Sequence, residues 1–190
     1  MRFRAFALLV CCALGALGAQ TRVVLETGQG TIEVELDGAR APVTTANFLR
    51  YLDGGFYDGG RIHRTVKMDN QPNNKIRIEV IQGGPTAERA KQGFAPIALE
   101  RTSQTGLSHK DGVISMGRDA PDTATSDFFI CIGDQPSLDF GGMRNPDGQG
   151  FAAFGHVVKG MDVVRKIQTA PAEGQRLTPA VTILKARRAP

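Results

Sequence analysis

The sequence has no tryptophan, and its 190 residues include only three cysteines, three histidines and two tyrosines. Two of the cysteines, Cys11 and Cys12, are adjacent near the start of the chain, and Cys131 lies within the apolar run 128–132. The histidines are widely separated and have no cysteine cluster beside them, so the ligand spacing of a metal site is absent. We therefore expect no metal site.

The motifs of nucleophilic, metal-dependent and nucleotide-dependent enzymes are also absent. The sequence contains no G-x-S-x-G, H-E-x-x-H or G-x-x-x-x-G-K-[ST]. The acidic pairs Asp119 with Asp122 and Asp127 with Asp134 are more typical of turns and loops than of a glycosidase site. We therefore expect no cofactor.

An excess of one charge is missing as well. The chain has 23 Lys and Arg against 19 Asp and Glu, a formal charge of +4 that falls to +2 without Arg2 and Arg4. Such a balance does not predict a nucleic-acid or membrane partner.

The first 19 residues have the layout of a secretory signal peptide. Arg2 and Arg4 precede an apolar run from residue 5 to about residue 17, and small residues follow up to Ala19. The run is shorter than the roughly 20 residues that span a bilayer, although a retained anchor is the alternative. We expect a single domain over 20–190, periplasmic or secreted and free of the membrane after cleavage. Its one cysteine, Cys131, is predicted to be a small buried hydrophobe rather than a reactive thiol.

The hydrophobic pattern predicts an all-β fold with two helices. Apolar residues alternate with polar ones, or form short runs between turn residues, in about nine segments. The expected strands are 23–27, 31–36, 61–66, 76–82, 97–100, 112–116, 128–132, 151–158 and 180–185. Helical spacing occurs over 42–52 and 161–168. Closing the sheet into a barrel removes its edges, and the polar segment 67–75 is expected to be an exposed insertion.

An ordered set of short motifs runs through the chain: IHR at 62–64, IQGG at 81–84, GVISMG at 112–117, SDFFICIG at 126–133, LD at 138–139 and FAAFGHVVKGMDVV at 151–164. This set resembles the cyclophilins, which are peptidyl-prolyl cis-trans isomerases. The resemblance covers essentially the whole chain after the signal peptide. It implies a closed eight-stranded antiparallel barrel capped by two α-helices, a monomer without cofactors, and proline-containing polypeptides as partners.

The resemblance also implies the site. It assigns Arg64 as the catalytic residue and, as substrate-binding residues, Val80, Gln82, Gly117, Arg118, Asp119, Asp127, Phe129, Leu138 and Phe151. Phe129 matches the floor of the proline pocket, Val80 and Leu138 match its walls, and Gln82 matches a glutamine that binds substrate backbone. Residues 117–119 match the strip that accepts the residues before proline.

Several positions depart from the family pattern. Glu79 stands where an aromatic residue often closes the pocket, and Asp127 replaces a glutamine. Ser137 replaces a tryptophan or its bacterial substitutes, and Phe151 replaces a histidine. Together with the 67–75 insertion, these changes put the affinity and the peptide preference in question.

Three alternatives remain open at this point. Arg64 taken alone fits a surface strand arginine, and Gln82 fits a turn residue before glycines. If Asp127 pairs with Arg64 rather than with Arg118, the pocket would bind proline peptides without turning them over, as a chaperone does. A lipocalin-type carrier would need a wide apolar interior, whereas Phe128, Ile130 and Phe154 are expected to fill this barrel.

Overall fold

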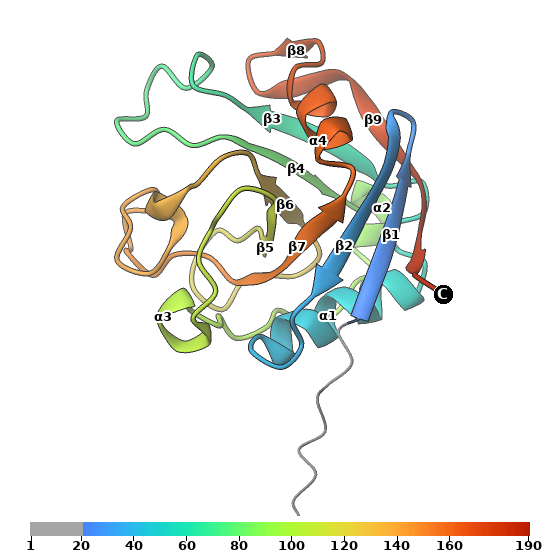
Figure 1. The fold of residues 1–190 in the computed structure, drawn as a ribbon, viewed down its shortest axis with the longest axis horizontal. Coiled ribbons are helices and arrows are strands. Elements are labelled where there is room, and N and C mark those ends of the chain that lie inside the picture. Colours follow the sequence, from blue (N-terminus) through green and yellow to red (C-terminus); the bar gives the residue numbers. More distant parts are fainter. Residues whose placement is uncertain (1–20) are drawn as a thin grey trace, which may run out of the picture.

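The computed structural model describes residues 21–190; the predicted signal peptide lies outside the described residues. Eight antiparallel strands close into a barrel in the order β1-β2-β7-β5-β6-β4-β3-β9, with β1 also paired to β9 (Figure 1). The strands are β1 Thr21–Thr27, β2 Gly30–Leu36, β3 Arg61–Val66, β4 Val80–Gly84, β5 Val113–Met116, β6 Phe128–Cys131, β7 Ala153–Lys159 and β9 Arg176–Arg188. A two-residue strand, β8 Ala172–Glu173, pairs only with β9. The predicted closed eight-stranded antiparallel barrel is confirmed.

Side-chain alternation sets the inner face of the barrel. In β2, Ile32, Val34 and Leu36 are buried, whereas Glu33 and Glu35 between them are partly exposed. Successive residues of a strand point to opposite faces, so the period-two pattern places one apolar row inside.

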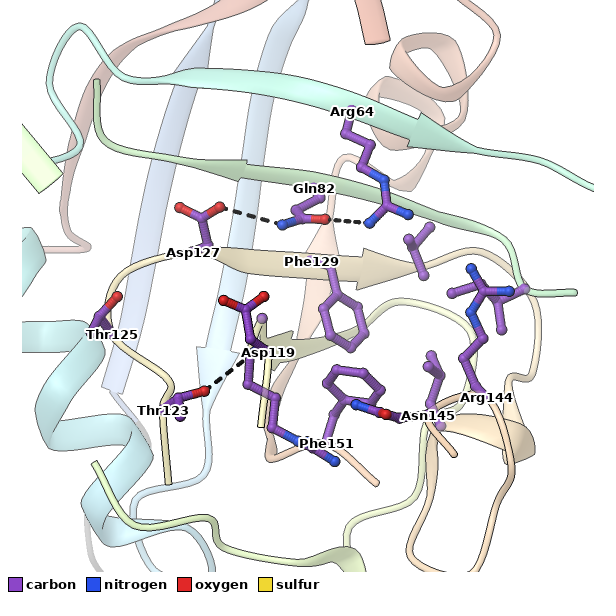
Figure 2. A pocket seen from close by; sticks show the side chains of 15 residues that line it. Arg64, Gln82, Asp119, Thr123, Thr125, Asp127, Phe129, Arg144, Asn145 and Phe151 are labelled. Carbon is purple, nitrogen blue, oxygen red and sulfur yellow. Dashed lines mark hydrogen bonds between the residues drawn. The ribbon is translucent and has the colours of Figure 1, made fainter. Parts of the chain in front are cut away.

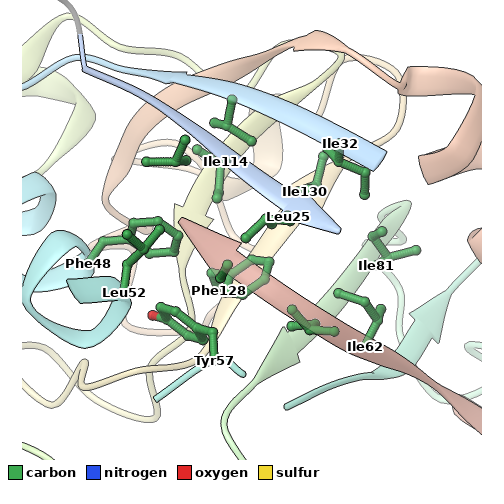
Figure 3. Close-up of a cluster of buried hydrophobic side chains, with 14 of the residues drawn as sticks. Leu25, Ile32, Phe48, Leu52, Tyr57, Ile62, Ile81, Ile114, Phe128 and Ile130 are labelled. Atoms are coloured by element: carbon green, nitrogen blue, oxygen red, sulfur yellow. The ribbon is translucent and has the colours of Figure 1, made fainter. Parts of the chain in front are cut away.

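Buried side chains of the strands and of the segment 42–53 fill the barrel, and Phe48, Tyr57 and Phe128 lie together among them (Figure 3). Phe48 packs against Tyr57, Phe128 and Phe154 at ring-centroid distances of 5.1, 5.8 and 5.3 Å. Phe128, Phe154 and Ile130 are fully buried, as the sequence predicts. This packed interior differs from the wide apolar cavity that a lipocalin-type carrier needs.

Helices α1 (Pro42–Asp53) and α4 (Met161–Gln168) lie at opposite ends of the barrel (Figure 1). Both were predicted, whereas the single-turn helices α2 (Ala87–Ala90) and α3 (Thr102–Thr105) and the 3-10 turn η1 (Pro136–Leu138) were not. Four or fewer residues are too few to show helical periodicity in the sequence. No helix within residues 21–190 is long and apolar enough to cross a membrane.

A distant carboxylate caps the first turn of α1. Glu100 accepts hydrogen bonds from the backbone N–H groups of Val43 and Thr44 at 3.0 and 2.7 Å, and from the Thr44 hydroxyl at 2.6 Å. Ala41, at the N-cap position, has no side-chain oxygen for this task. Glu100 therefore satisfies donors that the helix leaves open and places a negative charge at its positive end.

We expect Glu100→Ala to lower the free energy of unfolding by about 1 to 2 kcal/mol, because α1 loses its cap. Urea denaturation followed by circular dichroism measures this change. Glu88→Gln is the matched control, since Glu88 is exposed and the change also removes one negative charge. Equal stability of Glu100→Ala and the control would contradict the capping role.

Two predicted strands are corrected. Residues 76–79 lie outside β4, and the 97–100 segment contributes only a single bridge, between Ile97 and Ala124. The reason at 76–79 is Gln71, whose buried amide bonds to the carbonyl oxygens of Lys67 and Ile78 and to the Ile78 N–H. The Gln71 side chain thus bonds to the backbone of Ile78 where a neighbouring strand would otherwise pair. Because Gln71 is buried, the 67–75 insertion is anchored to the protein and is not the wholly exposed segment that the sequence had suggested.

Candidate active site

One cavity of about 370 Å³ contains all ten predicted site residues in its lining (Figure 2). It lies against the outer side of the barrel wall, where the segments after β5 and η1 face strands β4 and β6. The remaining lining residues are Ile78, Thr123, Thr125, Arg144 and Asn145.

The centre of the site is one row of residues across four neighbouring strands. Arg64 of β3 pairs with Gln82 of β4, Gln82 pairs with Phe129 of β6, and Phe129 pairs with Ser115 of β5. Directly paired residues place their side chains on the same face of a sheet. The register of the barrel therefore brings together four motifs that are separate in the sequence.

Arg64 is held by two amide side chains. Its Nη1 donates to Gln82 Oε1 at 2.8 Å, and its Nε and Nη2 donate to Gln175 Oε1 at 2.9 and 2.6 Å. The predicted proximity of Arg64 and Gln82 is confirmed. Burial lowers the pKa of the Arg64 guanidinium, yet an arginine stays charged at ordinary pH.

Asp127 forms an ion pair with neither Arg64 nor Arg118, the two partners considered from the sequence. Its Oδ2 accepts a 3.3 Å hydrogen bond from Gln82 Nε2 and lies 3.8 Å from His63 Nε2. Within residues 21–190, no carboxylate forms an ion pair with Arg64. The guanidinium is therefore available at the edge of the cavity.

Apolar side chains form the floor of the cavity. The rings of Phe129 and Phe151 meet edge to face, with centroids 5.4 Å apart and planes at 88°. Val80 and Leu138 are buried beside them in a cluster separate from the barrel core. Because Phe128 points inward, its neighbour Phe129 points into the cavity, so β6 serves two apolar clusters.

A buried polar chain supports the floor from behind. The His109 ring stacks on Phe129 at a centroid distance of 5.9 Å. His109 Nδ1 lies 2.6 Å from Asp139 Oδ1, and Nε2 lies 2.9 Å from Ser115 Oγ. Although serine, histidine and aspartate meet here as in a hydrolase triad, Ser115 is fully buried and does not line the cavity. These three hydrogen-bonded side chains therefore hold the Phe129 ring in place and do not supply a nucleophile.

Arg118 lines the cavity, but its guanidinium is already hydrogen-bonded within the protein. Its guanidinium donates to both Asp147 carboxylate oxygens, at 2.6 and 2.9 Å, and its Nε donates to the Gly150 carbonyl at 2.8 Å. It also lies 4.9 Å from the centre of the Phe151 ring. These contacts hold the 147–151 segment against the cavity, which no sequence pattern indicated.

Gln175 and the five further lining residues were not predicted from the sequence. Gln175 holds Arg64, and Arg144 lines the cavity while its Nη1 donates to the Ile76 carbonyl at 2.7 Å. Ile78 lines the cavity, whereas Glu79, which the family pattern places at the pocket, does not. The Glu79 carboxylate instead accepts a hydrogen bond from Gln168 of α4 at 3.1 Å. The only sequence signal for Ile78 was its place in an alternating apolar run.

Cys131 is fully buried behind the cavity, as predicted. Burial raises the pKa of its thiol well above the ordinary value, so the reactive thiolate is suppressed. The residues described here also contain no group of three or more side chains placed to hold a metal ion.

Comparison with known proteins identifies the family. The model of the cyclophilin type peptidyl-prolyl cis-trans isomerases matches residues 22–188. The chain is 36% identical over 154 residues to a peptidyl-prolyl cis-trans isomerase of Acinetobacter baylyi, covering 80% of this chain and 74% of that one. It is 38% identical over 159 residues to peptidyl-prolyl cis-trans isomerase A of Dickeya dadantii, covering 83% and 76%.

A solved structure has the same fold. The crystal structure of a cyclophilin type isomerase of Cryptosporidium parvum superimposes with a TM-score of 0.72 at 20% identity, covering 90% of this chain and 98% of the other. The chain is therefore an enzyme of the cyclophilin-type peptidyl-prolyl cis-trans isomerase family.

Proposed function

We propose that the protein accelerates X-Pro rotation in exported or unfolded polypeptides, with Arg64 stabilising the twisted amide above an apolar proline pocket. The observation that carries this mechanism is the guanidinium of Arg64, held by two amides beside the Phe129 floor and without an ion-pair partner among residues 21–190. This arrangement suits a reaction that needs no nucleophile.

The reaction is slow because the peptide bond has partial double-bond character. Rotation crosses a barrier of about 18–20 kcal/mol, and X-Pro exchange takes tens to hundreds of seconds. In the twisted state the proline nitrogen regains its lone pair and accepts a hydrogen bond. A site that binds this state more strongly than either planar isomer accelerates the exchange.

The hydrogen bonds of Arg64 and Gln82 leave donors for a substrate. A guanidinium has five N–H groups, of which three donate within the protein, so two remain. Gln82 uses one amide hydrogen on Asp127, and in the proposed complex the other donates to the carbonyl oxygen of the residue before proline. Phe129, Phe151 and the adjoining apolar walls hold the ring, so that the chain turns about one bond.

The proposed location rests on the N-terminal segment. The charged, apolar and small-residue regions of residues 1–19 direct export, so the clients are proteins folding outside the cytoplasm. Cell fractionation, with mass spectrometry of the N-terminus of the recovered protein, tests this: an intact Met1 in the cytoplasmic fraction would contradict export.

Magnetisation-exchange NMR on a short Ala-Pro peptide tests the mechanism. We expect faster cis-trans exchange with catalytic amounts of protein, and the loss of this effect in Arg64→Ala. The alternative is a proline-peptide-binding chaperone on the same fold. Peptide binding by shift perturbation, without faster exchange, would favour the chaperone.

A further inference from the structure

The cavity is divided by charge (Figure 2). Arg64 and Arg144 lie at one end, Asp119 and Asp127 lie at the other, and the rings of Phe129 and Phe151 lie between them. A proline ring seated on the aromatic residues would therefore have a positive end of the site on one side and a negative end on the other.

The positive end is a pair of neighbouring guanidinium groups. Arg144 is anchored through its Nη1 to the Ile76 carbonyl and through its backbone N–H to the Ser137 carbonyl, at 2.7 and 3.1 Å. Burial and the nearby charge of Arg64 lower the pKa of Arg144. Two positive charges at one end of the cavity favour an anionic partner.

The negative end lacks a lysine or arginine of its own. Within residues 21–190, Asp119 forms no ion pair, and Asp127 has only the distant His63 ring at 3.8 Å. Arg118, adjacent to Asp119 in the chain, is fully engaged by Asp147. By contrast, Asp53 and Asp58 elsewhere on the surface pair with Arg188 and Lys185. The two cavity carboxylates are thus open to a cation brought by a ligand.

We propose that the site selects polypeptides with a lysine or arginine directly before the proline and an acidic residue after it. The direction rests on the proposed function, in which Gln82 binds the carbonyl of the residue before proline. The nitrogen of the Gln82 amide lies on the side of Asp127, because it donates to that carboxylate. A substrate carbonyl bound by this nitrogen also lies on that side, so the substrate residues before proline extend toward Asp127 and Asp119. The chain that follows proline then leaves past Arg144. Opposite charges give affinity, and like charges exclude the reversed sequence.

The first test compares peptides that differ at one position. Peptides with Lys-Pro, Ala-Pro and Glu-Pro between identical alanine flanks are measured by exchange NMR at low and high salt. We expect kcat/KM to be roughly 3- to 10-fold higher for Lys-Pro than for Glu-Pro at low salt, the range of one or two partly exposed ion pairs. High salt should reduce the ratio, because it screens exposed charges.

Charge-removing variants assign the preference to residues. In Asp119→Asn with Asp127→Asn, the ratio of Lys-Pro to Glu-Pro should fall to about one. A second pair of peptides carries glutamate or lysine after Ala-Pro, and in Arg144→Gln the advantage of glutamate over lysine at this position should disappear. Glu88→Gln is the matched control, since it removes an exposed charge on α2 and should keep both ratios.

The outcomes separate this inference from the proposed function. If Ala-Pro exchange is accelerated but Lys-Pro and Glu-Pro rates are equal, charge selection is wrong and the isomerase mechanism stands. A preference for lysine after proline would overturn the proposed chain direction, and a ratio that persists in the double asparagine variant would overturn the role of the carboxylates. If no peptide is accelerated, the proposed mechanism itself fails.

Discussion

Replacing Arg64 by alanine is expected to lower kcat/KM for Ala-Pro exchange by roughly 100- to 1,000-fold, the usual loss when one preorganised donor to a transition state is removed. Two N–H groups of Arg64 have no partner among residues 21–190, and Arg64 stands in the row of paired strand residues that contains Phe129. The variant should still fold, because Arg64 lies outside the barrel core.

Arg64→Lys separates charge from geometry. Lysine keeps the positive charge but cannot contact Gln82, Gln175 and a substrate through one planar fork. We expect a loss nearly as large as that of alanine. Thermal unfolding of both variants controls for folding, and near wild-type exchange by well-folded Arg64→Ala would remove Arg64 from the mechanism.

Adjacent phenylalanines of β6 should give opposite results. Phe128 is fully buried among Phe48 and Tyr57, so Phe128→Ala is expected to cost about 3–5 kcal/mol of stability. Phe129→Ala removes the cavity floor, so its main effect is expected on kcat/KM. Urea denaturation and exchange NMR on both variants measure the two effects.

Leucine variants keep the comparison valid if either alanine variant fails to fold. Phe128→Leu should lose stability and retain exchange activity, whereas Phe129→Leu should retain more stability and lose activity. Equal losses of activity in the two folded variants would show that the two faces of β6 do not act separately.

The sequence was sufficient to predict the barrel because its elements carry local signals. Alternation identifies the β1–β2 hairpin, and Pro42 followed by helical spacing identifies α1. The predicted strand residues 76–79 and 97–100 were wrong, because neither segment forms a continuous ladder. The Gln71 side chain bonds to the backbone of Ile78, and Ile97 makes a single bridge to Ala124.

The candidate site was predictable only where residues sit in motifs. Arg64, Gln82 and Phe129 belong to short motifs, and the pairing of their strands places them side by side. Gln175 lies 111 positions from Arg64, and its contact depends on how β9 passes β3. The engagement of Arg118 by Asp147 likewise depends on a loop conformation that no local pattern encodes.

Closure of the barrel has a consequence for an enzyme whose family acts on proline-containing peptides. Extended polypeptides readily add to a free strand edge through backbone hydrogen bonds, which leads to tight complexes or aggregation. Among the described strands, β1–β9 pairing leaves only the two-residue β8 at the end of the sheet. The described strands therefore present almost no edge to which a bound proline-containing peptide could add as a further strand, which favours contacts limited to the cavity and easy release.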